Sequence, residues 1–176
     1  MVVNPALKPK VATTGLVLTS AVVLIFLALV PLAILASELP TVIKIVLASV
    51  LLASALMLLW LWWKRYAQRR TWTTNAEARW RSFNNARVTS GTTTEVTLLS
   101  IDAVQPTGSW VTIMWNRFNH IQPAWIEPLP EPVWVGHVLL IAPDPTQVMP
   151  GAPWPATYFI RAADCLAWAP AEGRHP

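Results

Sequence analysis

The chain contains few cysteines, few glycines and few charges. It has one cysteine, Cys165, six glycines and 12% charged residues in a length of 176. A single cysteine cannot form an internal disulfide, and thiolate metal sites need several cysteines at fixed spacing. We expect Cys165 to be a buried, unreactive thiol, because the neighbouring Asp164 has the wrong charge to activate it.

Sequence motifs of catalysis are also absent. The sequence has no P-loop and no G-x-G-x-x-G or G-x-S-x-G pattern. Its three histidines, His120, His137 and His175, are far apart and form no H-E-x-x-H pattern. We therefore expect a protein that is not an enzyme and that has neither a cofactor nor a metal site.

Apolar length is what the sequence has in excess. Two apolar runs, Thr13–Ala36 and Thr41–Trp63, are separated only by Ser37–Pro40. About 20 apolar residues cross a bilayer, so each run is long enough for a transmembrane helix. The short link turns the second helix back, which predicts a transmembrane hairpin over residues 13–63. The first run is longer than the apolar region of a cleaved signal peptide and lacks a good cleavage site, so we expect it to be retained.

Basic residues flank both ends of the predicted hairpin. Lys8 and Lys10 lie in an N-terminal arm, residues 1–12, and seven basic residues against one acid lie in residues 64–87. Short flanks rich in Lys and Arg stay cytoplasmic, which predicts a multi-pass protein of the cell membrane with both termini in the cytoplasm. The pI of about 9.7 therefore does not indicate nucleic-acid binding, since residues 88–176 are acidic overall.

The second run carries two groups of candidate contact residues. Ser49 and Ala53 are four residues apart, a small-residue spacing that permits close contact with the first helix or with a membrane partner. An aromatic belt followed by a basic anchor is expected to meet anionic lipid headgroups at the cytoplasmic face. These residues are Trp60, Trp62, Trp63, Lys64, Arg65, Arg69 and Arg70.

Residues 64–91 form a basic juxtamembrane collar. Thr74 and Glu77 fit a capping box, which predicts a separate short amphipathic helix from there to about Arg87. Trp80 and Phe83 would share its apolar face. Such a helix either lies on the lipid surface or packs on the following domain, and the sequence favours neither.

Beyond Gly91 the pattern changes to the two-residue period of β-strands. Strands are expected at Thr92–Ile101, Trp110–Trp115, Val133–Ile141 and Tyr158–Arg161, with a strand or short helix over Arg161–Trp168. Proline-rich stretches predict a loop or edge segment at Pro123–Pro132 and a second loop at Pro143–Pro155. The pattern predicts a small β-rich cytoplasmic domain, a barrel or rolled sheet over residues 92–169, followed by a frayed tail at 170–176.

Tryptophan is abundant in this domain and its collar. Eight of the eleven tryptophans follow residue 70, too many to bury in so small a core. Tryptophan is enriched where proteins meet partners. We therefore expect Trp125 and Trp154, in the two proline-rich stretches, to be exposed partner contacts. The alternative is that each covers its own loop as a lid on the core.

The order of these parts resembles small bacterial membrane proteins with a two-helix hairpin, a basic neck and a pleckstrin-homology-like cytoplasmic domain. The paired spans, the neck Lys64–Arg70 and the strands from Thr92 carry the resemblance. The proline-rich loops and the lack of a long C-terminal helix depart from it. The Trp-, Pro- and Ala-rich composition looks actinobacterial. Small hairpin proteins of that group are similar to accessory subunits of membrane complexes, including the cytochrome bcc–aa3 respiratory supercomplex.

The sequence thus predicts an α+β membrane protein that is a non-catalytic accessory or scaffold subunit of an integral-membrane complex. The respiratory supercomplex of electron transport is one candidate host. The alternative is a membrane-tethered module that binds a lipid headgroup or a peptide. A third hypothesis is an enzyme whose site includes His120 or His137.

Overall fold

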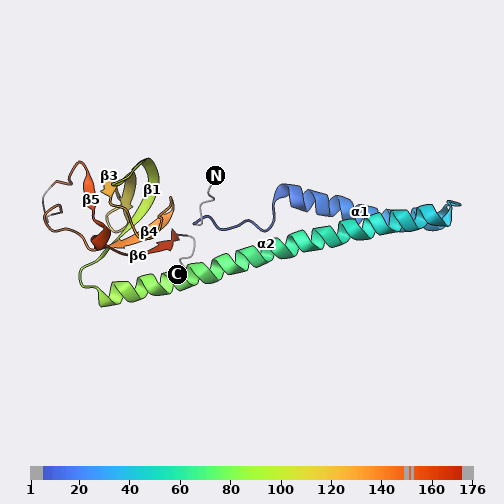
Figure 1. The fold of residues 1–176 in the computed structure, drawn as a ribbon, viewed down its shortest axis with the longest axis horizontal. Coiled ribbons are helices and arrows are strands. Elements are labelled where there is room, and N and C mark those ends of the chain that lie inside the picture. The colour runs from blue at the N-terminus through green and yellow to red at the C-terminus, as the bar shows by residue number, and fades with distance from the viewer. Residues whose placement is uncertain (1–5, 149–150, 152, 172–176) are drawn as a thin grey trace. The chain divides into compact units, whose positions relative to one another are not determined.

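The computed structural model describes residues 6–148, 151 and 153–171, and in this part of the chain two helices precede six strands (Figure 1). The helices are α1 (Thr14–Ala36) and α2 (Thr41–Thr89). The strands are β1 (Thr94–Gln105), β2 (Gly108–Trp115), β3 (His120–Ile126), β4 (His137–Ile141), β5 (Tyr158–Ile160) and β6 (Cys165–Pro170), with a 3-10 turn, η1 (Ala162–Asp164), before β6. The chain forms two compact units: one is Pro9–Trp72, and the other is built on Thr73–Pro176.

The first unit contains the predicted helical hairpin. Both α1 and α2 are long and apolar enough to cross a bilayer, as judged by length and composition. The side chains that the two helices cover recur every three or four residues, which is the spacing of a coiled-coil seam. In α1 these are Leu16, Ser20, Val23, Leu27, Val30 and Ile34, and in α2 they include Lys44, Leu51, Ala55, Leu58, Trp62 and Arg65.

Polar contacts hold the two ends of this seam. At the turn, Lys44 Nζ donates to the Ser37 carbonyl at 2.8 Å. At the open end, Trp62 Nε1 donates to Ser20 Oγ at 3.0 Å, and Arg65 Nη1 donates to Thr13 Oγ1 at 2.7 Å. Hydrogen bonds with defined partners favour one register of two helices, which apolar contacts alone specify weakly.

The predicted separate amphipathic helix is wrong. Helix α2 runs without a break from Thr41 to Thr89, so the Thr74–Glu77 box lies inside it and does not mark the start of a helix. The sequence has neither glycine nor proline between Thr41 and Ser90, and Gly91 is the first residue of either type after α2 begins. A capping box starts a helix only where the preceding chain leaves helical geometry.

The six strands form one curled, half-open sheet with the order β5-β3-β2-β1-β4-β6. Neighbouring strands are antiparallel except β3 and β5, which are parallel. The α+β class and a small β-rich domain are therefore confirmed, with a rolled sheet in place of a closed barrel.

Strand β3 covers part of the stretch that was expected to be a loop or an edge. Pro123 lies inside β3 opposite Thr112, although proline cannot donate a backbone hydrogen bond. It is tolerated because β5 pairs with β3 only from Ala124 onward, which leaves the other side of β3 open at Pro123. The following strand, β4, begins at His137, four residues later than predicted.

Two apolar clusters stabilise the β unit. The concave face of the sheet buries the larger cluster, which includes Leu98, Ile113, Trp115, Leu139 and Tyr158. The second cluster lies on the opposite face, where α2 packs on β4 and β6. Every residue of β4 is buried as a result.

The last turns of α2 form the second cluster. Trp80 and Phe83 are 8% and 0% exposed and pack against Val138, Leu140 and Ala169. Of the two positions considered for the basic collar, this part of it therefore packs on the domain. Trp80 Nε1 also donates to the Pro170 carbonyl at 2.9 Å, so Pro170 belongs to β6 and not to a frayed tail. Ala171 of that predicted tail donates its N–H to the Gly136 carbonyl at 3.0 Å, and residues 172–176 lie outside the described residues.

We expect Phe83→Ala to lower the free energy of unfolding of the β unit by about 3–5 kcal/mol, since it removes a fully buried ring. The measurement is chemical denaturation of the full chain in detergent, followed by tryptophan fluorescence. Val88→Ala is the control, because Val88 lies on the same helix and is 86% exposed. Equal effects of the two substitutions would contradict the packing of α2 on the sheet.

Candidate functional site

The first candidate surface is the side of α2 turned away from α1. Ser49 and Ala53 are both exposed and lie off the seam that contacts α1. A two-residue offset from Leu51 rotates a position by about 200°, so they face the opposite direction. Of the two uses considered for this pair, packing on α1 is thus not what the structure shows. We define the outward stripe as Val42, Val46, Ser49, Ala53, Leu56, Trp60 and Trp63, all of which are exposed.

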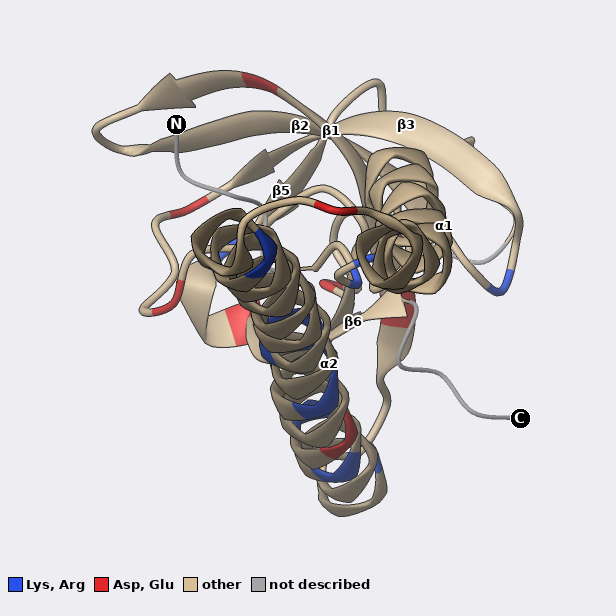
Figure 2. Cartoon of the chain, turned by 90° about the vertical axis from the view of Figure 1, so that its right-hand side faces the viewer, with Lys and Arg blue, Asp and Glu red and all other residues tan. Residues whose placement is uncertain are grey.

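The predicted aromatic belt and basic anchor divide into two groups. Trp62 and Arg65 face α1, where they form the hydrogen bonds to Ser20 and Thr13. Trp60, Trp63 and the anchor residues Lys64, Arg69 and Arg70 are exposed. Lys64 Nζ lies 5.1 Å from the centre of the Trp60 ring, a cation–π contact. Figure 2 shows the basic residues distributed along α2.

Trp154 covers the core and is half-buried. Its ring stacks on His120 at 4.5 Å and contacts Trp115 at 5.2 Å and Phe118 at 5.5 Å. Of the two alternatives considered for Trp154, this position matches the lid, in which the tryptophan folds over its own loop, and not the exposed partner contact. His120 is held further by its Nε2, 3.2 Å from Gln122 Oε1.

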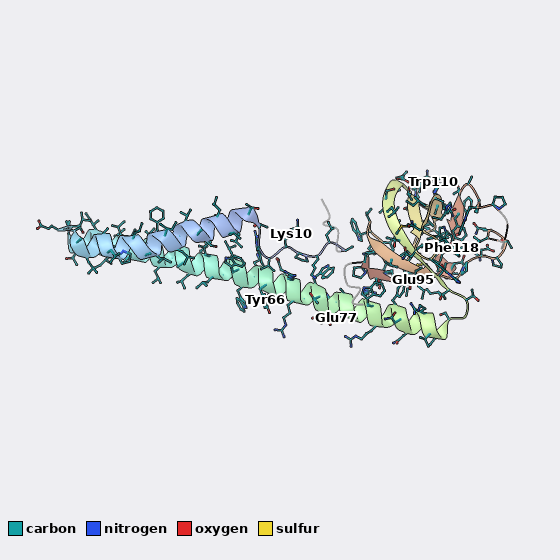
Figure 3. The ribbon with its side chains drawn as sticks, turned by 180° about the vertical axis from the view of Figure 1, so that it is seen from behind. Lys10, Tyr66, Glu77, Glu95, Trp110 and Phe118 are labelled. Carbon is teal, nitrogen blue, oxygen red and sulfur yellow. The ribbon has the colours of Figure 1, made fainter. Side chains whose placement is uncertain are left out.

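Trp125 lies on the convex face of the sheet, in a row of aromatic residues. Its register partners are Trp110 on β2 and Phe159 on β5. The Trp110 and Trp125 rings meet edge to face, with centroids 5.0 Å apart. Phe159 is 51% exposed and Trp110 is 36% exposed. Trp110 lies on the side of the domain away from α2 (Figure 3).

A second row on the same face continues this apolar surface. Met114 and Ile121 are register partners four residues along their strands from Trp110 and Trp125, beyond the Thr112–Pro123 pair, and Ile121 is 57% exposed. We define the convex patch as Trp110, Met114, Ile121, Trp125 and Phe159. Helix α2 covers the convex face only at β4 and β6. Of these residues, only Trp125 was predicted as a contact, although the alternation Trp110, Thr112, Met114 in the sequence already places two members on one face of β2.

Gly108 allows Trp125 its position. The backbone of Gly108 has φ +156°, and a Cβ built there would lie 2.6 Å from Trp125 Cζ2 and 2.5 Å from the Ile126 carbonyl oxygen. A side chain at this position would therefore displace either the tryptophan ring or the β3 backbone.

His137 is a buried structural residue. Its ring is fully buried and stacks on Trp168 at 4.2 Å, while the Arg79 guanidinium lies 4.4 Å from the same indole on a cation–π contact. Nδ1 accepts the Trp134 backbone N–H at 3.2 Å, so the proton of the neutral ring is on Nε2. Burial, with a smaller contribution from Arg79, lowers the His137 pKa to about 4.

Other ionisable groups of the domain form local structure. Glu131 pairs with Arg79 at 2.8 Å and accepts from Trp168 Nε1 at 3.0 Å. Burial raises the Cys165 pKa to about 11, so its thiol is protonated at neutral pH. No three metal-ligating side chains converge within the described residues.

Comparison with known proteins returns no relative: no protein-family model, no curated protein and no solved structure matches the chain. The outward stripe lies on the hairpin unit and the convex patch on the β unit. Both are mainly apolar and both include tryptophan. Every residue of the outward stripe is exposed, whereas Met114 and Trp125 of the convex patch are half-buried.

Acid should destabilise the β unit through His137. The unfolded chain binds a proton at pH 6.5 and the folded chain only near pH 4, so stability falls as the pH drops through this interval. The full loss is about 3 kcal/mol for a shift of this size. Denaturation midpoints of the full chain at pH 7.5 and pH 4.5 measure it.

The control for this experiment is His137→Phe, which keeps a stacked ring on Trp168 and removes the titration. We expect the variant to lose less stability than the unmodified chain between the two pH values. An identical pH dependence in both would contradict a neutral, buried His137.

Proposed function

We propose that the chain is a non-catalytic accessory subunit of a larger integral-membrane complex. The observation that carries this proposal is the convex patch. Single exposed apolar residues are ordinary on protein surfaces, whereas contiguous apolar patches mark interaction sites. Here two tryptophans and a phenylalanine form one row on a sheet face, and a methionine and an isoleucine form a second pair on the same face, beyond the Thr112–Pro123 pair. Tryptophan is also the residue type most enriched among energetically dominant interface contacts.

In this proposal the hairpin inserts into the cell membrane. The apolar length of α1 and α2 supports insertion, and the basic residues at Lys8, Lys10 and Lys64–Arg87 support cytoplasmic termini. Exposed Lys64, Arg69 and Arg70 would then meet anionic headgroups. The outward stripe would face the helices of the partner, with Ser49 and Ala53 at the point of closest approach.

The host complex and the domain type belong to the same proposal. The cytochrome bcc–aa3 supercomplex is one candidate host, on the resemblance of architecture described above. A rolled six-stranded sheet supports a pleckstrin-homology-like domain. In this chain, however, the helix that packs on the sheet precedes the strands, whereas a long C-terminal helix follows them in the resembling proteins.

A tagged copy purified from native membranes in mild detergent should bring down a membrane complex in fixed ratio. Mass spectrometry identifies the partners, and haem bands in the absorption spectrum of the eluate would indicate a respiratory host. The double substitution Ile121→Gln and Phe159→Gln should reduce recovery of the partner by about tenfold or more, because it makes the convex patch polar. Recovery of the unmodified chain alone would refute the accessory role.

The matched control is Val88→Gln. Val88 is as exposed as any patch residue but lies at the end of α2, outside the convex patch. Its partner recovery should equal that of the unmodified chain. Equal losses in the control and in the patch variant would show that the patch has no specific role.

The role of the outward stripe can be tested by enlarging one of its small side chains. Ala53→Leu fills the proposed point of closest approach and should weaken partner recovery by several-fold, while the hairpin stays intact because Ala53 does not face α1. Val50→Leu, at a position 59% exposed and off the stripe, should have no effect. If Ala53→Leu unfolds the hairpin, the assignment of Ala53 to the outward side is wrong.

A further inference from the structure

Strand β1 is longer than the strand beside it. β1 pairs with β2 as far as Gln105, but β4 pairs only with Thr94–Thr97. Beyond Thr97, the described backbone hydrogen bonds on the β4 side of β1 reduce to one, from Gly136 N to the Leu98 carbonyl at 2.9 Å. The remaining half of β1 therefore presents a strand edge with unpaired backbone groups.

At the opposite end of the sheet, the edge strand β5 has its outer backbone groups satisfied. The side-chain amide of Gln147 accepts from Phe159 N at 2.8 Å and donates to the Phe159 carbonyl at 3.0 Å. The Gln147 amide thus satisfies both backbone groups of the central residue of β5, as a neighbouring strand would. This contact blocks the β5 edge from further pairing. The open edge of β1 thus contrasts with a closed one in the same sheet.

An apolar cavity lies beside the open edge. Its volume is about 310 Å³, at the lower end of the range for ligand pockets. One wall is the concave side of the sheet, with Ile101, Val104, Val111 and Ile126, and the other is the loop before β4, with Leu129 and Val133. The cavity occupies the place where the half-open sheet lacks a further strand. Val104, at its mouth, is 76% exposed.

The charge around this slot is negative. Glu127 and Glu131 line the cavity, no Lys or Arg does, and Asp102 lies on the adjoining edge. Glu131 is paired with Arg79, whereas Glu127 accepts the Ala162 backbone N–H and interacts with Arg161 only at longer range. Asp102 accepts the hydroxyls of Ser100 and Thr112. An occupant with cationic groups beside its apolar part fits this rim, and an anionic headgroup does not.

We propose that this slot binds an extended segment of a partner protein by strand addition to β1. The backbone of the segment would pair with the free half of the β1 edge, and one large apolar side chain would enter the cavity. Lys or Arg residues flanking that side chain would face Asp102 and Glu127. Register irregularities at Leu98/Ser100 and Ile101/Ala103 keep the added ladder short, because bulges interrupt pairing. The inference does not rest on the accessory-subunit proposal, since the slot and the convex patch share no residue.

The probe is a random decapeptide library displayed on phage and selected against the full chain in lipid nanodiscs. Enriched peptides should share a large apolar residue flanked by Lys or Arg. For a synthetic copy of the strongest binder, methylating alternate backbone nitrogens should abolish binding in one of the two alternating sets only. That pattern is specific to a strand that pairs along one edge.

Substitutions in the chain test whether the peptide binds at the slot. Val104→Asp should weaken peptide binding, measured by fluorescence anisotropy, by about tenfold or more, because it places a charge at the mouth of the cavity. Glu127→Gln should weaken it several-fold and reduce its salt dependence, while the amide oxygen still accepts from Ala162 N. Ile121→Asp, on the convex patch, is the control and should bind like the unmodified chain.

Four results would overturn the slot. These are no enrichment over empty nanodiscs, equal binding by Val104→Asp, loss of binding in Ile121→Asp alone, or equal sensitivity to both sets of N-methyl groups. Self-association that Val104→Asp abolishes, measured by sedimentation, would assign the edge to a second copy and would also overturn the proposal.

Discussion

The β unit depends on the contact between the last turns of α2 and the sheet. A curled sheet of six short strands has two faces, and its concave core covers only one of them at β4. Trp80 and Phe83 cover the other face there, and Trp80 also binds the end of β6. Because α2 is unbroken, the helix that begins at the hairpin turn is the same helix that completes the core of the domain.

The hairpin and the domain use polar groups in the same way. In each, apolar side chains pack together and a few partly buried polar or aromatic contacts select one arrangement. Trp62 to Ser20 and Arg65 to Thr13 do this for the helix pair. The stack of Arg79, Trp168 and His137 does it where α2 meets β6. The apolar side chains left over on both units are those that form the outward stripe and the convex patch.

Much of this fold could be predicted from local sequence, and the site could not. The length of the apolar runs predicts the helices, and two-residue alternation of apolar side chains predicts most strands, because both signals lie in the local sequence. The capping box at Thr74 led to the wrong prediction that a new helix starts there, since cap residues are also tolerated inside a helix. Trp125 was found by its residue type, but its neighbours Trp110 and Phe159 come from other strands. Cross-strand register, and the shortness of β4 that leaves the β1 edge open, depend on tertiary pairing.

The double coverage of β4 sets the order in which the β unit opens. A strand that is buried on both faces and paired on both sides exchanges its amide hydrogens only when the whole unit unfolds. Strand β5 has three residues, a single strand partner and a glutamine side chain on its outer side. Opening of β5 would therefore move Phe159 of the convex patch and expose Tyr158 and Ile160 of the concave core, while the second cluster beneath α2 stays in place.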